Sequence, residues 1–322
     1  MGRKRVGELS WVDAAVKEVT AGRRDKLSEI SQLLNWSAIE RLLDGIHASA
    51  RGEAAYPPVV MFKVLLLQRW YSLSDPAMEE ALADRLSFRR FVGLSLEDET
   101  PDHSTIWRFR EELSRRGLIE PLMDEMVGQL DDRGLLLKQG TLIDATLVQG
   151  AARRPRKKEG KTSRTDPKAR FGTNNERRRF EFGYKGHVAV DGGSALVRAV
   201  RMTPANIQEI DVAVELVQGD ELALYADRGY DAEHLHAHLA ALGIADGIMR
   251  RNRKGRLLSD RDVARNHALA GRRRPVEKVF GTLKRSYRLA RLPYFNRARN
   301  TVAFALACFA YNLRRVHALT TP

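Results

Sequence analysis

The chain has 322 residues, enough for one large or two ordinary domains, each with its own core. Hydrophobic residues make up 43% of it, which excludes an intrinsically disordered protein. A net charge of +14 indicates a polyanionic partner, most commonly nucleic acid, and the one cysteine, Cys308, excludes an internal disulfide and suits a reducing compartment.

The sequence predicts neither a signal peptide nor a membrane span. The first residues, MGRKRVGELSW, are basic but lack an apolar run. The longest apolar stretch, 302–311, is too short to cross a bilayer and predicts a buried helix. We therefore expect a cytoplasmic protein with no membrane partner.

The first 130 residues are predicted to be helical, because apolar residues recur there at helical spacing. Ser, Asp or Pro marks the beginning of most of these segments, and Gly marks the end of several. The predicted helices cover 10–22, 35–48, 56–74, 75–85 and 101–117. This pattern indicates an all-α amino-terminal domain over 1–130.

After residue 135 the hydrophobic period changes to that of alternating strands and helices. Predicted strands cover 135–150, 180–191, 194–204, 222–231 and 244–252, and predicted helices cover 205–219, 232–243, 272–290 and 297–317. The turn Asp191-Gly192-Gly193 predicts a hairpin between two of these strands. The order indicates an α/β domain with a mixed sheet over 131–322.

Positive charge is concentrated in two segments. Residues 151–185 carry a net charge of +9 and residues 250–290 carry +11, so the rest of the chain is mildly acidic. A single charged run is ordinarily a solvated loop. Two runs near the same acidic positions instead indicate basic insertions at 150–180 and 250–275 that hold a polyanion.

Three carboxylates are candidates for a shared site. Asp144 lies among apolar residues in LIDATLV, where a buried unpaired charge would be costly. Asp227 lies at the carboxyl end of a predicted strand, although an isolated Asp there is commonly a turn residue. Glu277 lies on a helix edge with Arg273 and Lys284, which would otherwise be a surface ion-pair edge. Three such carboxylates can hold Mg²⁺, which would neutralise Asp144.

These segments resemble the IS5 group of bacterial insertion-sequence transposases, which have a DDE catalytic domain. The resemblance rests on the ordered series LIDATLV, DPKARFGTNNERRRFEFGYKGHVAVD, TPANIQEID, YADRGYD and RRPVEKVFGTLKR, together with the helical region from PVVMFKVLL to FREEL. Arg273, Glu277 and Lys284 fit the carboxy-terminal motif of the family. Its tyrosine position is Ala270 here, which leaves any tyrosine role at that position in question.

The resemblance implies an RNase H-like fold in which Asp144, Asp227 and Glu277 are catalytic and bind two Mg²⁺ ions, for which Mn²⁺ would substitute. The expected partners are the element's terminal inverted repeats and target DNA, with the protein acting as a homodimer on the bacterial nucleoid. The residues expected to contact DNA are Arg273, Lys284, Arg288, Lys185, His187, Arg177 and Arg178.

Two other functions remain open on the sequence. A metal-dependent nuclease or resolvase of the same fold would cut DNA without joining it, and a decayed transposase would bind DNA without catalysis. The helical amino-terminal domain and the order of the family segments disfavour the first alternative, and the complete carboxylate set disfavours the second. In the run His234, His236 and His238, the first and last share a helix face and could bind zinc, but surface histidines are the more common explanation.

Overall fold

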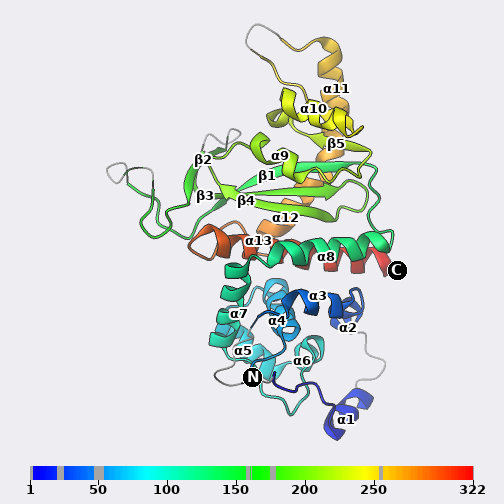
Figure 1. The fold of residues 1–322 in the computed structure, drawn as a ribbon, viewed down its shortest axis with the longest axis vertical. Coiled ribbons are helices and arrows are strands. Elements are labelled where there is room, and N and C mark those ends of the chain that lie inside the picture. The colour runs from blue at the N-terminus through cyan, green and yellow to red at the C-terminus, as the bar shows by residue number, and fades with distance from the viewer. Residues whose placement is uncertain are drawn as a thin grey trace. The chain divides into compact units, whose positions relative to one another are not determined.

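The computed structural model describes most of the chain, which forms two compact units (Figure 1). Each unit is described by itself, because their positions relative to one another are not determined. The first unit comprises 1–129 with 309–322, and the second comprises 130–308. The described residues are 3–19, 25–46, 54–156, 160, 162–174, 179–253 and 257–321. The functional division at 130/131 stays a prediction; residues 309–322 group with the first unit.

The first unit is helical, as expected from its sequence. Its helices are α1 (Trp11–Val19), α2 (Lys26–Ser31), α3 (Trp36–Leu43), α4 (Pro58–Tyr71), α5 (Asp75–Asp84), α6 (Leu86–Val92), α7 (His103–Arg116) and most of α8 (Ile119–Asp132). Helix α4 is buried around most of its circumference, because apolar residues occupy nearly every position. A buried Arg110 donates to Asp75 (Nη1–Oδ2 3.0 Å) and to Gln68 (Nη2–Oε1 2.9 Å), so the charge is paired in the interior.

The second unit contains a six-stranded mixed sheet. Its strands are β1 (Thr141–Gln149), β2 (Arg170–Asn174), β3 (Arg179–Asp191), β4 (Val197–Pro204), β5 (Ala223–Ala226) and β6 (Ala245–Ile248). The main order is β4-β3-β1-β5-β6, antiparallel among the first three and parallel among the last three, and β2 adds to β3. This mixed sheet has the RNase H-like topology expected from the sequence.

Helices cover both faces of this sheet (Figure 1). They are α9 (Ile210–Leu216), α10 (Glu233–Ala241), α11 (Asp260–Ala270), α12 (Arg274–Arg285) and the first part of α13 (Arg297–Thr320), with short 3-10 turns η2 (Arg228–Tyr230) and η3 (Gly271–Arg273). On β3, Ala189 packs in one core cluster with Ala213 of α9, whereas Gly186 faces the Phe304 ring of α13. Residues 186 and 189 point to opposite faces because side chains alternate along a strand.

The sequence misjudged several local features. The predicted helix over 272–290 is the shorter α12 preceded by η3, while strand β2 and helix α11 lie in the basic segments and were not predicted. Strand β2 and helix α11 have few large apolar residues, so their period is weak. Helices α2, α6 and α8 lie in the region expected to be helical but were not predicted individually. The hairpin after Asp191 is confirmed, since its carboxylate accepts hydrogen bonds from the Ser194 and Lys138 backbone amides (both 2.8 Å). No helix of the described residues is long and apolar enough to cross a membrane.

Candidate active site

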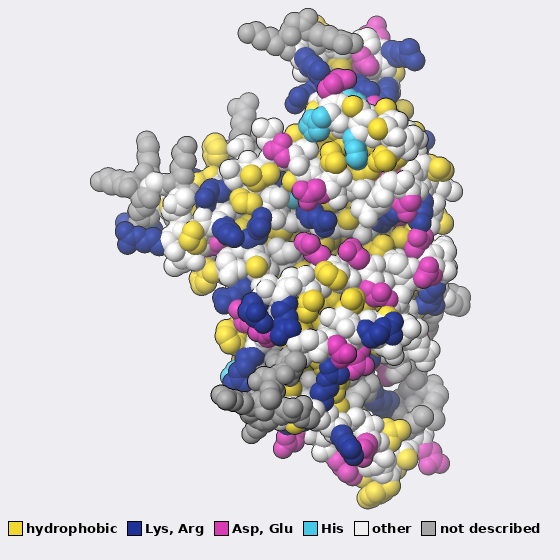
Figure 2. All heavy atoms as spheres, viewed as in Figure 1, with side chains coloured by type: hydrophobic (Ala, Val, Ile, Leu, Met, Phe, Trp, Pro, Cys, Tyr) yellow, Lys and Arg dark blue, Asp and Glu magenta, His cyan; other side chains and the backbone are white. Residues whose placement is uncertain are grey.

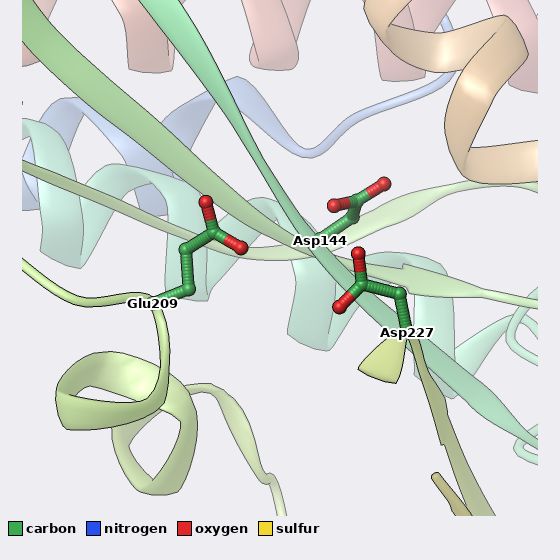
Figure 3. Close-up of side chains that lie close together, drawn as sticks. All are labelled: Asp144, Glu209 and Asp227. Atoms are coloured by element: carbon green, nitrogen blue, oxygen red, sulfur yellow. The ribbon is translucent and has the colours of Figure 1, made fainter. Parts of the chain in front are cut away.

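Three carboxylates converge at one place in the second unit. Asp144 comes from β1, Asp227 directly follows β5, and Glu209 directly precedes α9. One oxygen from each lies within 4.8 Å of the others, and all three side chains are partly buried. Figure 3 shows the three carboxylates pointing toward one another. Within the described part of the chain this is the one cluster of acidic, histidine or cysteine side chains with metal-site spacing.

The register of the sheet explains why two of these carboxylates meet. Strand β5 pairs in parallel with β1 at Thr141 and Leu142, and it ends at Ala226. Continuing that register by two residues would set Asp144 beside Asp227. Side chains at equivalent positions of neighbouring strands share one face of a sheet, so the two aspartates are adjacent. Functional groups in α/β sheets gather at such carboxyl ends.

Asp227 also shapes the turn that follows it. Its Oδ1 accepts a hydrogen bond from the Gly229 backbone amide at 2.7 Å, which starts η2. Sequence reasoning left open whether Asp227 is a turn residue or a site residue. In the structure the same carboxylate caps the turn and lies in the acidic cluster, and its role as a site residue stays a prediction.

Asp144 is paired with an arginine. Its Oδ2 accepts from Arg273 Nη2 at 2.7 Å, and its Oδ1 accepts from the Ala145 backbone amide at 2.8 Å. Burial raises the pKa of Asp144 to about 7, the Arg273 charge opposes that rise, and Asp227 adds to it. The ion pair with Arg273 therefore compensates only part of the cost of placing a carboxylate here.

Glu209 is held by a lysine from β3. Lys185 Nζ lies 3.2 Å from Glu209 Oε1 and donates to the Ile207 carbonyl oxygen at 2.9 Å. Burial raises the pKa of Glu209, and the Lys185 charge opposes this. Lys185 therefore ties the segment before α9 to the sheet and keeps the Glu209 carboxylate close to the two aspartates.

Sequence analysis did not single out Glu209. It lies in TPANIQEID, where an acidic residue near a helix start is ordinary and gives no sign of a site. One feature of the sequence could have indicated Glu209 as a site residue. It lies between Asp144 and Asp227 along the chain, in the segment TPANIQEID that contributed to the family resemblance. Its proximity to them depends on how α9 packs on the sheet.

Glu277 lies outside the three-carboxylate cluster. It is exposed in the first turn of α12, one turn after Arg273, and its charge contributes to the raised pKa of Arg273. The structure thus places Glu277 near the arginine that binds Asp144. Its role as a metal ligand is neither established nor contradicted by this placement, and it stays a prediction.

The residues expected to contact DNA lie in different environments. Arg288 is exposed just beyond α12 and Lys284 is partly buried in its last turn. His187 is fully buried, its Nε2 lies 2.8 Å from Thr203 Oγ1, and burial lowers its pKa to about 3, which disfavours a phosphate contact. Arg177 and Arg178 lie outside the described residues.

The histidine run forms no cluster with metal-site spacing in the described residues. His236 Nε2 instead lies 2.9 Å from Asp231 Oδ1, and Arg250 Nη1 donates to the same ring nitrogen at 2.6 Å. The ring therefore belongs to a network of charged side chains around the end of β6.

The donor set of the acidic cluster fits a divalent cation. Three carboxylates face one paired arginine and one paired lysine, which leaves a net negative charge in a partly buried space, and carboxylate oxygens are the ligands that Mg²⁺ and Mn²⁺ prefer. Burial is the main cause of the raised pKa of Asp144 and of Glu209, and the charge of the neighbouring Asp227 adds to both. A cluster of this kind on a mixed sheet is able to hold the divalent ions that are used in phosphoryl transfer.

Comparison with known proteins identifies the family. Residues 136–313 match the family model described as the transposase DDE domain, and residues 15–112 match the transposase domain DUF772. The chain therefore belongs to the DDE transposases, enzymes of DNA transposition that cleave and transfer DNA with divalent metal ions.

Solved transposase structures are among the similar proteins. A piggyBac transposase synaptic complex with hairpin DNA is 10% identical, with a TM-score of 0.43, and the match covers 92% of this chain and 74% of that one. A Mos1 transposase paired-end complex with the left transposon end is 10% identical, with a TM-score of 0.21, over 89% and 95% of the two chains.

Proposed function

We propose that this chain is a transposase of the IS5 group that moves its own insertion sequence. It binds the terminal inverted repeats, pairs them as a homodimer on the nucleoid, hydrolyses the phosphodiester at each end and transfers the 3′-hydroxyl ends to target DNA. The observation that carries the proposal is the convergence of Asp144, Glu209 and Asp227 within 4.8 Å in a domain of this family.

The metal ligands in this proposal are Asp144 and Asp227, with Glu209 and Glu277 contributing to one site each. Two Mg²⁺ ions, or Mn²⁺ in their place, would supply Lewis acidity toward the scissile phosphate. The protein side chains position the reaction: Lys185 holds Glu209, and the backbone amides of Ala145 and Gly229 hold the two aspartates. Arg273, beside Asp144, carries the positive charge that phosphate oxygens require.

DNA binding in this proposal depends on the basic segments. Figure 2 shows Lys and Arg side chains in dark blue around the α11 end of the second unit. Exposed arginines of this region are Arg251, Arg253, Arg261, Arg272 and Arg274. Phosphate contacts made by such side chains release counterions, so DNA affinity should fall steeply with salt.

Strand transfer in vitro tests the proposal and separates it from its alternatives. The purified protein is incubated with a labelled, pre-cut element end and a supercoiled plasmid, in Mg²⁺ or in EDTA. Joined product that requires metal and Asp144 supports the transposase. Cutting without joining would instead support a nuclease or resolvase, and binding without either reaction would support a decayed DNA-binding protein. The element ends are read from the genomic sequence on either side of the gene.

A further inference from the structure

The ring of Tyr225, on strand β5, lies between two glycines. A Cβ added at Gly140 would lie 2.3 Å from Cε2 of the ring, and a Cβ added at Gly247 would lie 2.3 Å from Cδ1. Neither glycine has a positive φ, so the backbone conformation does not require them. Glycine in a strand, as Gly247 is in β6, commonly marks a close approach. Here the Tyr225 ring makes that approach, and its position is fixed on both edges.

The Tyr225 hydroxyl in turn holds a second side chain, that of Arg272 in η3. Arg272 Nη1 donates to the hydroxyl at 2.5 Å, and its Cζ lies 5.1 Å from the centre of the ring. A hydrogen bond and a cation–π contact therefore both act on the guanidinium. Arg272 is nevertheless exposed to solvent. The two contacts thus orient a side chain that burial does not.

The charge of Arg272 is not neutralised within the described part of the chain. No carboxylate of the described residues forms an ion pair with it, whereas its neighbour Arg273 is paired with Asp144. A guanidinium has five N–H donors, and the Tyr225 hydroxyl accepts from only one of its nitrogens. Donors therefore remain for an anion, and phosphate is an anion that the planar guanidinium suits well.

The pair formed by Tyr225 and Arg272 lies beside the acidic cluster. Tyr225 points to the face of the sheet opposite the core cluster, because the residues before and after it on β5 both belong to that cluster. Asp227 follows Tyr225 by two positions, and Arg272 directly precedes Arg273, which donates to Asp144. Each member of the pair is therefore within two residues of a side chain of the candidate active site.

We propose that Arg272 binds a phosphate of the DNA backbone beside the acidic cluster, and that Tyr225 is the positioning residue that presents it. This inference rests on the proposed function, because it requires DNA at the cluster. A DNA strand whose reacting phosphate lies at the cluster carries further phosphates on both sides, and Arg272 contacts one of them. An arginine that is already oriented loses little side-chain freedom when DNA binds, which favours affinity.

The experiment measures DNA binding in EDTA, so that neither cutting nor joining contributes to the signal. A fluorescently labelled element end is titrated with the full-length wild-type chain, Tyr225→Phe, Arg272→Gln and the double variant, at several salt concentrations. Arg201→Gln is the matched control, because that arginine is paired with Glu215. The melting temperature of every variant is measured in the same buffer.

Arg272→Gln should lower the slope of log affinity against log salt by about one, because one phosphate contact is lost. Tyr225→Phe keeps the ring between its glycines and the charge on Arg272. It should weaken binding about three- to tenfold, the equivalent of one hydrogen bond, with the slope nearly unchanged. In the double variant the tyrosine change should have no further effect, since Tyr225 acts only through Arg272. Arg201→Gln should bind like wild type.

Three results would overturn the inference. An unchanged salt slope in Arg272→Gln would show that this arginine contacts no phosphate. An equal loss of affinity from Tyr225→Phe with and without Arg272 would show that the hydroxyl does not act through the arginine. A Tyr225→Phe chain that does not fold would show that the hydroxyl is needed for the fold, and Arg272→Gln then tests the phosphate contact alone. Failure of the proposed function is distinguishable, because wild type itself would then not bind the element end.

Discussion

Arg273 Nη2 donates to Asp144 Oδ2 over 2.7 Å, joining two residues that are 129 positions apart in the chain. The pair is partly buried, with 17% of the arginine side chain and 15% of the aspartate side chain exposed. A strand that begins the second unit and a helix near its end are thereby connected at the acidic cluster. In the metal-free protein, Arg273 supplies part of the positive charge that the cluster needs.

Arg273→Gln should therefore destabilise the metal-free protein more than the metal-loaded one. Removing one partner of a partly buried ion pair should cost about 1–3 kcal/mol in EDTA. Saturating Mg²⁺ should recover part of this loss, because the cations also neutralise Asp144. The measurement is urea unfolding of the full-length chain with and without Mg²⁺.

Arg272→Gln is the matched control for this change, since Arg272 is exposed and donates to the Tyr225 hydroxyl instead. It should have the same small effect under both conditions. An equal loss for Arg273→Gln in EDTA and in Mg²⁺ would contradict the idea that Arg273 balances the charge of the cluster.

The pH dependence of stability should report on Asp144. Burial raises its pKa to about 7 from an unfolded value of 3.8, so between these values the folded state binds a proton that the unfolded state has lost. This contribution is complete below pH 3.8 and is lost as the pH rises through 7. In EDTA, the free energy of unfolding of wild type should fall between pH 5 and pH 8 by about 1–3 kcal/mol more than that of Asp144→Asn. Parallel pH profiles for the two proteins would argue against the raised pKa.

The two candidate third carboxylates should behave differently. Glu209→Gln should weaken Mn²⁺ binding by the free protein at least about tenfold, because this carboxylate already lies in the cluster. Glu277→Gln should leave Mn²⁺ binding at the Asp144–Glu209–Asp227 cluster nearly unchanged, since Glu277 is exposed and outside the cluster. It should abolish strand transfer, because the second metal site of the proposed function loses its carboxylate. Glu215→Gln, an exposed residue of α9 that pairs with Arg201, is the control. Loss of Mn²⁺ binding in Glu277→Gln alone would reverse this assignment.

Gly183 should tolerate no side chain. A Cβ at this position of β3 would lie 2.3 Å from the Gly150 nitrogen and 2.4 Å from the Val148 carbonyl oxygen. Both are backbone atoms, so the clash can be relieved only by shifting a segment of the main chain. Gly183→Ala should cost about 1–3 kcal/mol in thermal unfolding. Gly128→Ala, on helix α8 with no atom within 4 Å of the added Cβ, should be neutral or stabilising. Equal melting temperatures for the two variants would refute the close contact between β1 and β3.

Arg288→Gln should lower DNA affinity through the phosphate backbone. The side chain is exposed directly after α12, close in sequence to the residues of the candidate site. Loss of one phosphate contact should lower the slope of log affinity against log salt by about one. Arg201→Gln removes the same charge from a residue paired with Glu215 and should leave the slope unchanged. Fluorescence anisotropy with a labelled element end at several salt concentrations gives both slopes.

The sequence by itself determined most of the local elements and two of the three clustered carboxylates. Alternating apolar residues predicted β1, β3, β4, β5 and β6, and the helical period predicted α1, α3, α4, α5, α7 and α13. Asp144 and Asp227 were identifiable because each interrupts or ends an apolar strand. These are properties of neighbouring residues, and neighbouring residues are what a sequence pattern reports.

The tertiary structure decided which side chains meet. Glu209 joins the aspartates because α9 packs on the sheet with its start beside the end of β5, and Arg273 reaches Asp144 because α12 packs against β1. Tyr230 is buried in the core because η2 turns its ring toward residues of β1, β5 and α10. Each of these contacts depends on the register and packing of segments far apart in the chain, which no local period encodes.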